Sequence, residues 1–224
     1  MAKLIYLMGA SGSGKDTLLN YLKAHNIKDL EHKQLKTRKN PPTTINPPHS
    51  IFTDNKQKII VAHRYITHNQ ESCDESHIFL YENDFQFRLE NSFFVMAWKS
   101  NNLKYAVGRE VYHWVNGGHN VIVNGSRAYL PVAKKIFGDS LIPICLNVPE
   151  AILVERLLSN GHASQRVIEQ RLSQARTYAN GLPNYTHFID NDCDIKTLAI
   201  RLYQILNTVD DESANFRLYE ELSD

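Results

Sequence analysis

The stretch MGASGSGKDT, residues 8 to 17, carries the residues of this chain that are best suited to chemistry on phosphates. Gly9 to Lys15 follow the spacing G-x-x-x-x-G-K, in which glycines let successive backbone N–H groups converge on phosphate oxygens. Lys15 adds a positive charge for the β- and γ-phosphates, and the helix expected after it adds the positive end of its dipole. The predicted phosphate-binding residues are Gly9, Ala10, Ser11, Gly12, Ser13, Gly14, Lys15, Asp16 and Thr17.

The residue after the lysine is a carboxylate, Asp16, where this pattern usually has a Ser or Thr whose hydroxyl binds Mg²⁺. A carboxylate beside phosphate is repelled unless a cation lies between them. Mg²⁺ binds carboxylate oxygens together with substrate phosphates. The sequence therefore predicts that Asp16 is a metal ligand, directly or through a water. The alternative is that Asp16 points to solvent in the first helical turn and that the Thr17 hydroxyl is the ligand.

A dense group of polar side chains lies between residues 63 and 77. Arg64 and the Thr67 hydroxyl suit an anionic acceptor, and Glu75 suits the hydroxyl or amine groups of such an acceptor. The alternative is a solvated strand and turn, and residue types alone do not separate the two. We take residues 59–108 as the candidate acceptor-binding region.

Four arginines, at positions 156, 166, 171 and 176, lie on two predicted helices with apolar faces. Arginine stabilises the charge spread over a transferring phosphoryl group, and a helix pair can close over a site and exclude water. Each arginine alone is typical of a solvated helix surface. Together with a phosphate-binding loop, they predict a helical lid over residues 150–178.

Strands and helices alternate along the chain. Apolar runs predict strands over 3–8, 58–67, 104–108, 119–126, 140–148 and 186–192, with one more at the end of 81–98. Apolar residues at helical spacing predict helices over 15–25, at the start of 81–98, and over 110–118, 149–161, 164–179 and 195–209. This alternation is typical of an α/β fold with a mostly parallel sheet flanked by helices. We expect one domain over residues 1–224, because this length fits a single core.

Residues 26–58 break the alternation. They contain two Pro-Pro pairs, and proline supplies neither the N–H group nor the backbone freedom that a helix interior needs. We expect a solvent-exposed loop or insertion there.

The composition argues against several classes of protein. Lys and Arg number 25 against 24 Asp and Glu, so no overall charge favours a nucleic acid or an anionic membrane as partner. No apolar run has membrane-spanning length, and the N-terminal run LIYLM is too short for a signal peptide. The cysteines Cys73, Cys145 and Cys193 lack metal-ligand spacing and fit a reducing compartment. We expect a cytoplasmic protein.

Several segments together resemble the guanylate-kinase-like branch of the P-loop kinases, and within it the ribose 1,5-bisphosphate phosphokinases of phosphonate breakdown. The Asp after the loop lysine is usual in that narrower family, whereas guanylate kinases have Ser there. The NGSR sequence at 124–127 also agrees with the narrower family. The segments that carry the resemblance are LMGASGSGKDTLL, VAHRYIT, ESHIFL, LKYAVG, VIVNGSRAYLP, ERLLSNG, EQRLSQARTY and the ND at 191 and 192.

The resemblance implies transfer of the γ-phosphoryl group of ATP, with Mg²⁺, to the 1-phosphate of ribose 1,5-bisphosphate, giving 5-phosphoribosyl 1-diphosphate (PRPP) and ADP. It implies catalytic roles for Lys15, Arg156 and Arg171, and it places Asn191 near the adenine. It implies that the acceptor-binding residues are Arg64, Thr67, Glu75, His77 and Tyr105. It is also compatible with a homodimer.

The chain departs from the family pattern at His68, Asn160 and Ala106, where arginine, arginine and glycine are usual. A neutral histidine does not hold phosphate as a guanidinium does, so the acceptor is less firmly indicated than ATP. One alternative is a guanylate kinase in which Glu75 binds the guanine edge. Another is a non-catalytic interaction module, although such a module is expected to lose the loop lysine or glycines that this chain keeps.

Overall fold

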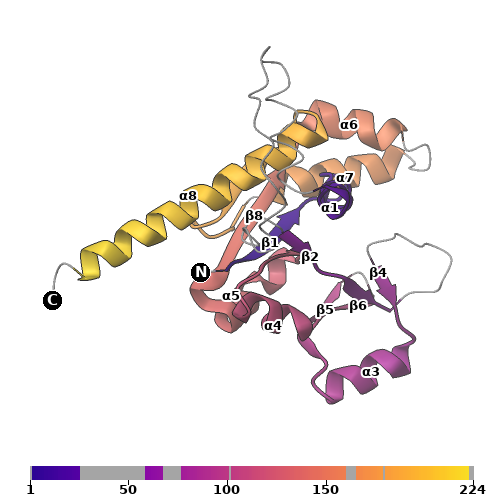
Figure 1. The fold of residues 1–224 in the computed structure, drawn as a ribbon. Coiled ribbons are helices and arrows are strands. Elements are labelled where there is room, and N and C mark those ends of the chain that lie inside the picture. Colours follow the sequence, from indigo (N-terminus) through magenta and orange to yellow (C-terminus); the bar gives the residue numbers. More distant parts are fainter. Residues whose placement is uncertain are drawn as a thin grey trace, which may run out of the picture.

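Two β-sheets organise the molecule. The computed structural model describes residues 2–25, 59–67, 77–100, 102–159, 165–178 and 180–221. Within these ranges a five-stranded sheet has the order β2-β7-β1-β8-β9, and every neighbouring pair in it is parallel. A four-stranded sheet has the order β4-β3-β6-β5. Figure 1 shows the five-stranded sheet in the middle of the molecule and the four-stranded sheet below it.

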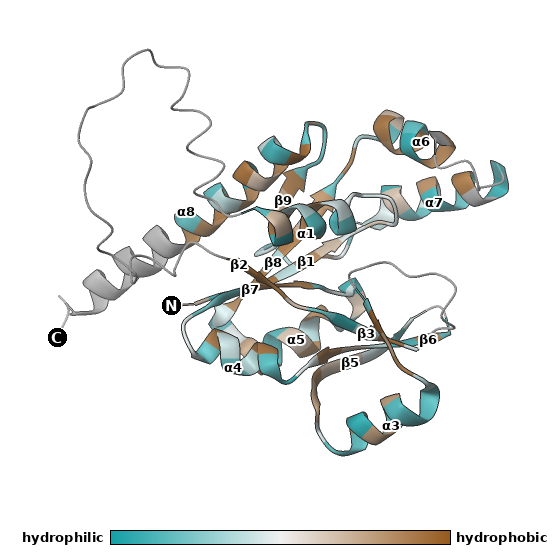
Figure 2. Ribbon diagram, turned by 45° about the vertical axis from the view of Figure 1, so that its right-hand side comes forward, coloured by the Kyte–Doolittle hydropathy of each residue, from teal (hydrophilic) through white to brown (hydrophobic). Residues whose placement is uncertain are grey.

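The five-stranded sheet forms the main core. All six residues of its middle strand β1 are buried, as expected for a parallel sheet that has helices on both faces. Figure 2 shows apolar residues along its strands. The strands are β1 (Leu4–Gly9), β2 (Ile59–Val61), β7 (Asn120–Asn124), β8 (Leu141–Asn147) and β9 (His187–Asp190).

Helices cover this sheet on its two faces, and alternate residues of β1 show how. Ile5 and Leu7 lie in one apolar cluster with α1 and α8, whereas Leu4, Tyr6 and Met8 lie in another with α4 and α5. Successive strand residues point to opposite faces, so each cluster fills one face. The prediction of an α/β fold with a parallel sheet flanked by helices is confirmed. The helices are α1 (Lys15–Ala24), α4 (Glu110–Asn116), α5 (Leu130–Phe137) and α8 (Ile195–Glu221).

The four-stranded sheet is mixed: β3 pairs parallel with β4 and antiparallel with β6, which pairs antiparallel with β5. Its helix α3 buries Phe85 against Phe94 of β5 and Ala106 of β6. The elements are β3 (Arg64–Ile66), β4 (His77–Phe79), α3 (Glu82–Glu90), β5 (Phe94–Ser100) and β6 (Leu103–Gly108).

The prediction of one strand over residues 58–67 was wrong. The chain makes β2 in the five-stranded sheet, leaves it after Ala62 and enters the other sheet at Arg64. The sequence of residues 58–67 does not indicate this change of sheet, because β2 and β3 are both extended and differ only in the strands with which they pair. The candidate acceptor region 59–108 therefore begins with a strand of the main core.

The helix pair expected over 150–178 is present as α6 (Glu150–Ser159) and α7 (Gln165–Tyr178). The two helices pack through Leu153, Leu157 and Ile168. Their bounds agree with the prediction, whereas their role as a lid stays a prediction. The predicted loop at 26–58 lies outside the described residues.

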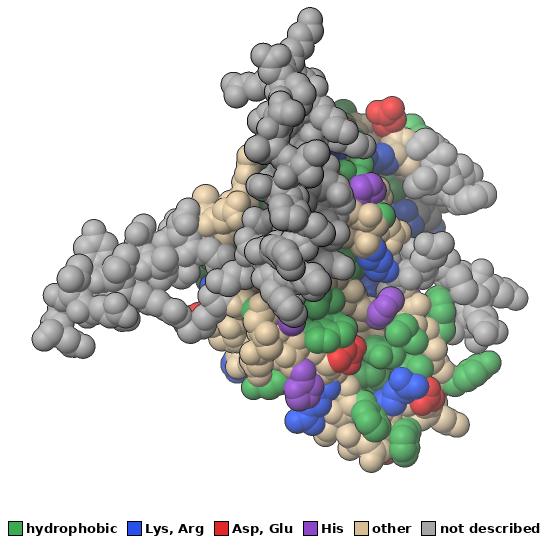
Figure 3. Space-filling model, in the orientation of Figure 1, with side chains coloured by type: hydrophobic (Ala, Val, Ile, Leu, Met, Phe, Trp, Pro, Cys, Tyr) green, Lys and Arg blue, Asp and Glu red, His purple; other side chains and the backbone are tan. Residues whose placement is uncertain are grey.

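A group of exposed apolar side chains lies on and beside α3. Tyr81, Phe87, Leu89 and Phe93 are exposed, and Figure 3 shows hydrophobic side chains on this lower part of the surface. Among the described helices, none combines the length and the apolar character that crossing a membrane requires.

Candidate active site

The loop between β1 and α1 has the geometry of a phosphate cradle. Ser13 N–H donates to Ala10 O, which closes the loop, and the Ser13 side chain is fully buried. Gly14 has a φ of 91°, and a Cβ there would press against the amide nitrogen of Asn191. Both the backbone conformation and the close contact therefore require glycine at position 14.

Lys15 is turned back onto this loop. Its Nζ donates to Gly9 O at 2.8 Å and to Ala10 O at 2.9 Å. Burial lowers the pKa of Lys15 to about 8; the negative charge of Asp16 opposes this shift, and the positive charge of Arg64 lowers the pKa further. The Lys15 ammonium group therefore lies at the loop, where the negative charge nearby does not fully offset the effect of burial on its pKa.

Asp16 does not point to open solvent. Its Oδ1 accepts a hydrogen bond of 3.0 Å from Asn124 Nδ2, at the carboxyl end of β7, whereas Thr17 is exposed. Both Asp16 and Thr17 line the groove described below. No group of three or more His, Cys, Asp or Glu side chains suited to a metal occurs in the described ranges. A carboxylate beside a phosphate cradle still fits Mg²⁺, because this ion takes few protein ligands and completes its shell with phosphate and water.

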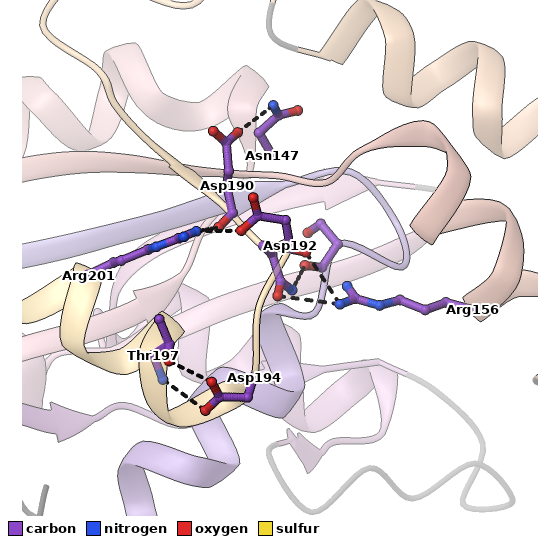
Figure 4. Close-up of polar contacts among 9 residues, drawn as sticks. Asn147, Arg156, Asp190, Asp192, Asp194, Thr197 and Arg201 are labelled. Atoms are coloured by element: carbon purple, nitrogen blue, oxygen red, sulfur yellow. Dashed lines mark hydrogen bonds and ion pairs between the residues drawn. The ribbon is translucent and has the colours of Figure 1, made fainter.

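Asn191 connects the loop to the helix pair. Its Nδ2 donates to Ser13 O at 2.8 Å, and its Oδ1 and backbone O each accept from Arg156 Nη2 at 3.4 Å. Asn191 is buried, so these contacts fix the loop from behind and aim the Arg156 side chain from α6 toward it (Figure 4).

Acidic residues around Asn191 hold the segment after β9 in place. Arg201 Nη1 donates to Asp192 Oδ1 at 2.6 Å, which lowers the pKa of Asp192. Asp194 accepts from the Thr197 hydroxyl and from the first N–H groups of α8, as an N-terminal cap does, and this lowers its pKa. Asp190 accepts from Asn147 of β8 at 2.8 Å (Figure 4). The segment that carries Asn191 is therefore anchored to both β8 and α8.

A groove of about 510 Å³ runs between this loop and the helix pair. Arg156 and Arg171 both line it. Arg176 instead pairs with Glu150 across the two helices, and Arg166 is exposed. The structure thus brings two of the four arginines to the phosphate cradle. The other predicted residues that line the groove are Gly12, Gly14, Lys15, Asp16, Thr17 and Asn191.

Three of the predicted acceptor residues lie together in the four-stranded sheet. Arg64 Nη2 contacts His77 Nε2 on the neighbouring strand, and the Arg64 guanidinium lies 5.0 Å from the centre of the Tyr105 ring. The effect of Arg64 on the pKa of Lys15 shows that this group is within electrostatic reach of the loop. Thr67 stands apart, because its hydroxyl accepts from Lys104 N–H and extends the sheet. Glu75, His68 and Asn160 lie outside the described residues.

Sequence reasoning missed Asn124 as a site residue. Its signal was a polar residue at the end of a buried strand, where parallel strands deliver side chains to one edge of the sheet. The turn after it is fixed by Tyr6, whose hydroxyl exchanges hydrogen bonds of 3.0 Å with Ser126 N and O. A Cβ at Gly125 would collide with the Tyr6 ring, so the glycine permits this contact.

Arg127 was also missed, and it holds the end of α7. Its Nη1 donates to Thr177 O at 3.1 Å and to Tyr178 O at 2.6 Å, and its guanidinium lies 4.8 Å from the centre of the Tyr178 ring. One end of the helix pair is thereby fixed to the turn that follows β7.

Comparison with known proteins decides the family. No family model matches the chain. Ribose 1,5-bisphosphate phosphokinase PhnN of Yersinia pestis is 35% identical over 206 residues, which are 92% of each chain. The protein of the same name from Enterobacter lignolyticus is 38% identical over 190 residues, 85% of this chain and 84% of the relative. The chain belongs to the ribose 1,5-bisphosphate phosphokinase (PhnN) family. The resemblance inferred from the Asp after the loop lysine and from NGSR is confirmed.

A solved structure shows where the fold of this PhnN-family chain recurs. Guanylate kinase from Anaplasma phagocytophilum matches with a TM-score of 0.57 and 15% identity, over 92% of this chain and 85% of that one. At this identity the match shows the shared fold and says nothing of the acceptor. The guanylate-kinase-like placement of the PhnN family is thus confirmed at the level of the fold.

Proposed function

We propose that this chain is an ATP-dependent ribose 1,5-bisphosphate phosphokinase that produces PRPP and ADP. The observation that carries the proposal is the similarity to proteins of this name over about nine-tenths of the chain. The phosphate cradle and the two arginines on its groove support it, because they supply what phosphoryl transfer from ATP requires. A non-catalytic module would be expected to lose the loop lysine, whereas Lys15 is present here and contacts the loop.

The chemistry asks little of the protein beyond position and charge. An oxygen of the acceptor 1-phosphate is already ionised at neutral pH, so it attacks the γ-phosphorus without a general base. A bond forms between that oxygen and the γ-phosphorus, and the bond from the γ-phosphorus to the β,γ-bridging oxygen breaks. The acceptor 1-phosphate and the β- and γ-phosphates of ATP must then lie close together. Electrostatic repulsion among these three anionic groups is the main barrier to the transfer.

We assign the neutralisation of this charge to three side chains. Lys15 leaves the carbonyl oxygens of Gly9 and Ala10 and contacts the β- and γ-phosphates. Arg156 and Arg171 approach from α6 and α7 and stabilise the charge on the transferring group. Asp16 would hold the Mg²⁺ that comes with the nucleotide, and the ion would supply further neutralisation of phosphate charge there.

We assign the acceptor to the face of Arg64, His77 and Tyr105. The Arg64 guanidinium only donates hydrogen bonds, so His77 Nε2 accepts from it. His77 and Tyr105 thus hold the Arg64 guanidinium in one orientation, so its other N–H groups favour one orientation of a bound phosphate. Glu75 and Thr67 stay predictions as residues of this acceptor subsite. The cytoplasmic location and the homodimer also stay predictions.

A substrate comparison tests the proposal. Purified protein is incubated with MgATP and either ribose 1,5-bisphosphate or GMP, and the products are separated by anion exchange and identified by ³¹P NMR. We expect PRPP and ADP from the first mixture and no GDP from the second. Lys15→Ala should abolish turnover, whereas Lys135→Ala, on the exposed side of α5, should not change it. Conversion of GMP alone would replace this proposal with a guanylate kinase.

A further inference from the structure

Asn124 and Asp16 form a contact that joins the sheet to the first helix. Asn124 ends β7 beside Leu7 of β1, and its exposed fraction is 6%. Its Nδ2 donates to Asp16 Oδ1 at 3.0 Å, across 108 positions of sequence. A buried side chain thus holds the carboxylate that follows the loop lysine.

The orientation of the Asn124 amide follows from this contact. An ionised carboxylate only accepts hydrogen bonds, so the amide nitrogen must face Asp16 and the amide oxygen must face away. Asn124 Oδ1 is buried, and no donor for it exists among the residues that the structure describes. A buried acceptor is seldom left without a donor, so this oxygen points to a ligand such as a bound water.

The two positions carry the reverse of the usual pair. P-loop enzymes hold Mg²⁺ with a Ser or Thr hydroxyl after the loop lysine and with an Asp supplied from elsewhere in the fold. Here the carboxylate follows the lysine, and an uncharged amide stands at the end of the strand next to β1. Each arrangement has one carboxylate and one neutral group, so the charge offered to the ion is the same.

We propose that Asp16 and Asn124 together form the metal site, with the carboxylate and the neutral group at each other's usual positions. Asp16 supplies the anionic oxygen to the divalent ion of the nucleotide. Asn124 is a positioning residue: its Nδ2 orients Asp16, and its Oδ1 accepts from a water bound to the ion. The inference rests on the proposed function only in that the ion arrives with a nucleoside polyphosphate.

The exchange makes a prediction that a merely structural contact does not. Asp16→Ser removes the carboxylate of this pair, and Asn124→Asp places two carboxylates together without a donor between them. In the double variant the new hydroxyl at position 16 donates to the new carboxylate at position 124. The usual pair is then restored, and metal binding should recover.

Metal binding is measured with Mn²⁺ as the probe, so that no acceptor or turnover is involved. The full chain is titrated with Mn²⁺ in the presence of ADP, and free Mn²⁺ is counted by electron paramagnetic resonance. ADP affinity in EDTA is measured separately. We expect Asp16→Ser to weaken the metal-dependent part of ADP binding by about tenfold or more, as loss of an ion's partner does elsewhere. Asp16→Ser/Asn124→Asp should return to within about threefold of the wild type.

Two further variants keep the test decisive. Asn124→Leu keeps the size and removes the donor, so it should weaken Mn²⁺ coupling without changing ADP affinity in EDTA. Asn116→Asp, at the exposed end of α4, is the control for an added carboxylate and should leave Mn²⁺ coupling unchanged. The pair assignment is overturned if the double variant is no better than the product of the two single effects, or if Asn124→Leu binds Mn²⁺–ADP like the wild type. Failure with ribose 1,5-bisphosphate alone would overturn only the proposed function.

Discussion

Binding of a nucleoside triphosphate should draw a proton onto Lys15. Burial lowers the pKa of this lysine from its ordinary value of 10.5 to about 8 in the nucleotide-free chain. At pH 8 about half of the ammonium groups are therefore deprotonated, and at pH 7 about one-tenth. Contact with the β- and γ-phosphates favours the charged form and raises the pKa again. A full return to 10.5 is equivalent to about 3 kcal/mol of interaction between Lys15 and phosphate.

The proton is measured by calorimetry with the β,γ-imido analogue of ATP and Mg²⁺. The binding enthalpy in Tris and in HEPES differs by the number of protons taken up, multiplied by the difference in the buffers' ionisation enthalpies. We expect an uptake of about 0.5 proton at pH 8 and about 0.1 at pH 7. Above pH 8 the dissociation constant should rise with pH, because the free protein must first gain the proton.

Lys15→Arg is the control, since a guanidinium stays charged at both pH values and takes up no proton. Other groups that titrate near pH 8 are the same in both proteins, so the difference between them isolates Lys15. An uptake at pH 8 that is equal in the wild type and in Lys15→Arg would refute the link between burial, the lowered pKa and phosphate binding.

Three further substitutions test the site. Asn191→Leu should lower the free energy of unfolding in urea by about 1–3 kcal/mol, because the Ser13 carbonyl loses its donor in a buried place; an unchanged midpoint would contradict this. Arg64→Ala should raise the acceptor KM at least about tenfold and the ATP KM less than about twofold in steady-state kinetics; equal effects would count against its assignment. Gly14→Ala and Gly118→Ala put a side chain at a φ of 91° and 90°, but only the first meets a neighbour, Asn191. Calorimetry should therefore show weaker binding of the ATP analogue to Gly14→Ala alone.

Much of the fold could be predicted from the sequence because the central strands of the parallel sheet are buried along nearly their whole length. β1 and β8 are short apolar runs bounded by polar turns, which indicates a parallel sheet without knowledge of contacts. The chain's change of sheet after Ala62 was not predicted, because strand pairing depends on residues far away in sequence. Helix α5 was missed as well, although Pro131 in its first turn is typical of the start of a helix.

The candidate site was predictable only where its residues are close together in sequence. Contiguous motifs such as the phosphate loop determine their own local geometry, so the loop conformation around Lys15 could be expected from the sequence. Asn124 contacts Asp16 across more than a hundred residues of sequence, and its place at the end of a buried strand indicates the edge of the sheet but not this partner. Sequence reasoning also grouped four arginines that the structure separates: Arg156 and Arg171 line the groove, whereas Arg176 pairs with Glu150.

The passage of the chain between the two sheets has a mechanical consequence. Every element of the four-stranded sheet lies between Ala62 and Arg109, so in the described part of the chain the backbone crosses to it once and returns once. Any rotation of the four-stranded sheet against the five-stranded sheet therefore concentrates its changes of backbone torsion at these two crossings. Neither ladder of hydrogen bonds needs to break. Such a rotation also has to shift Met96 and Val107, because these residues of the four-stranded sheet pack in the same apolar cluster as the middle strand of the other sheet.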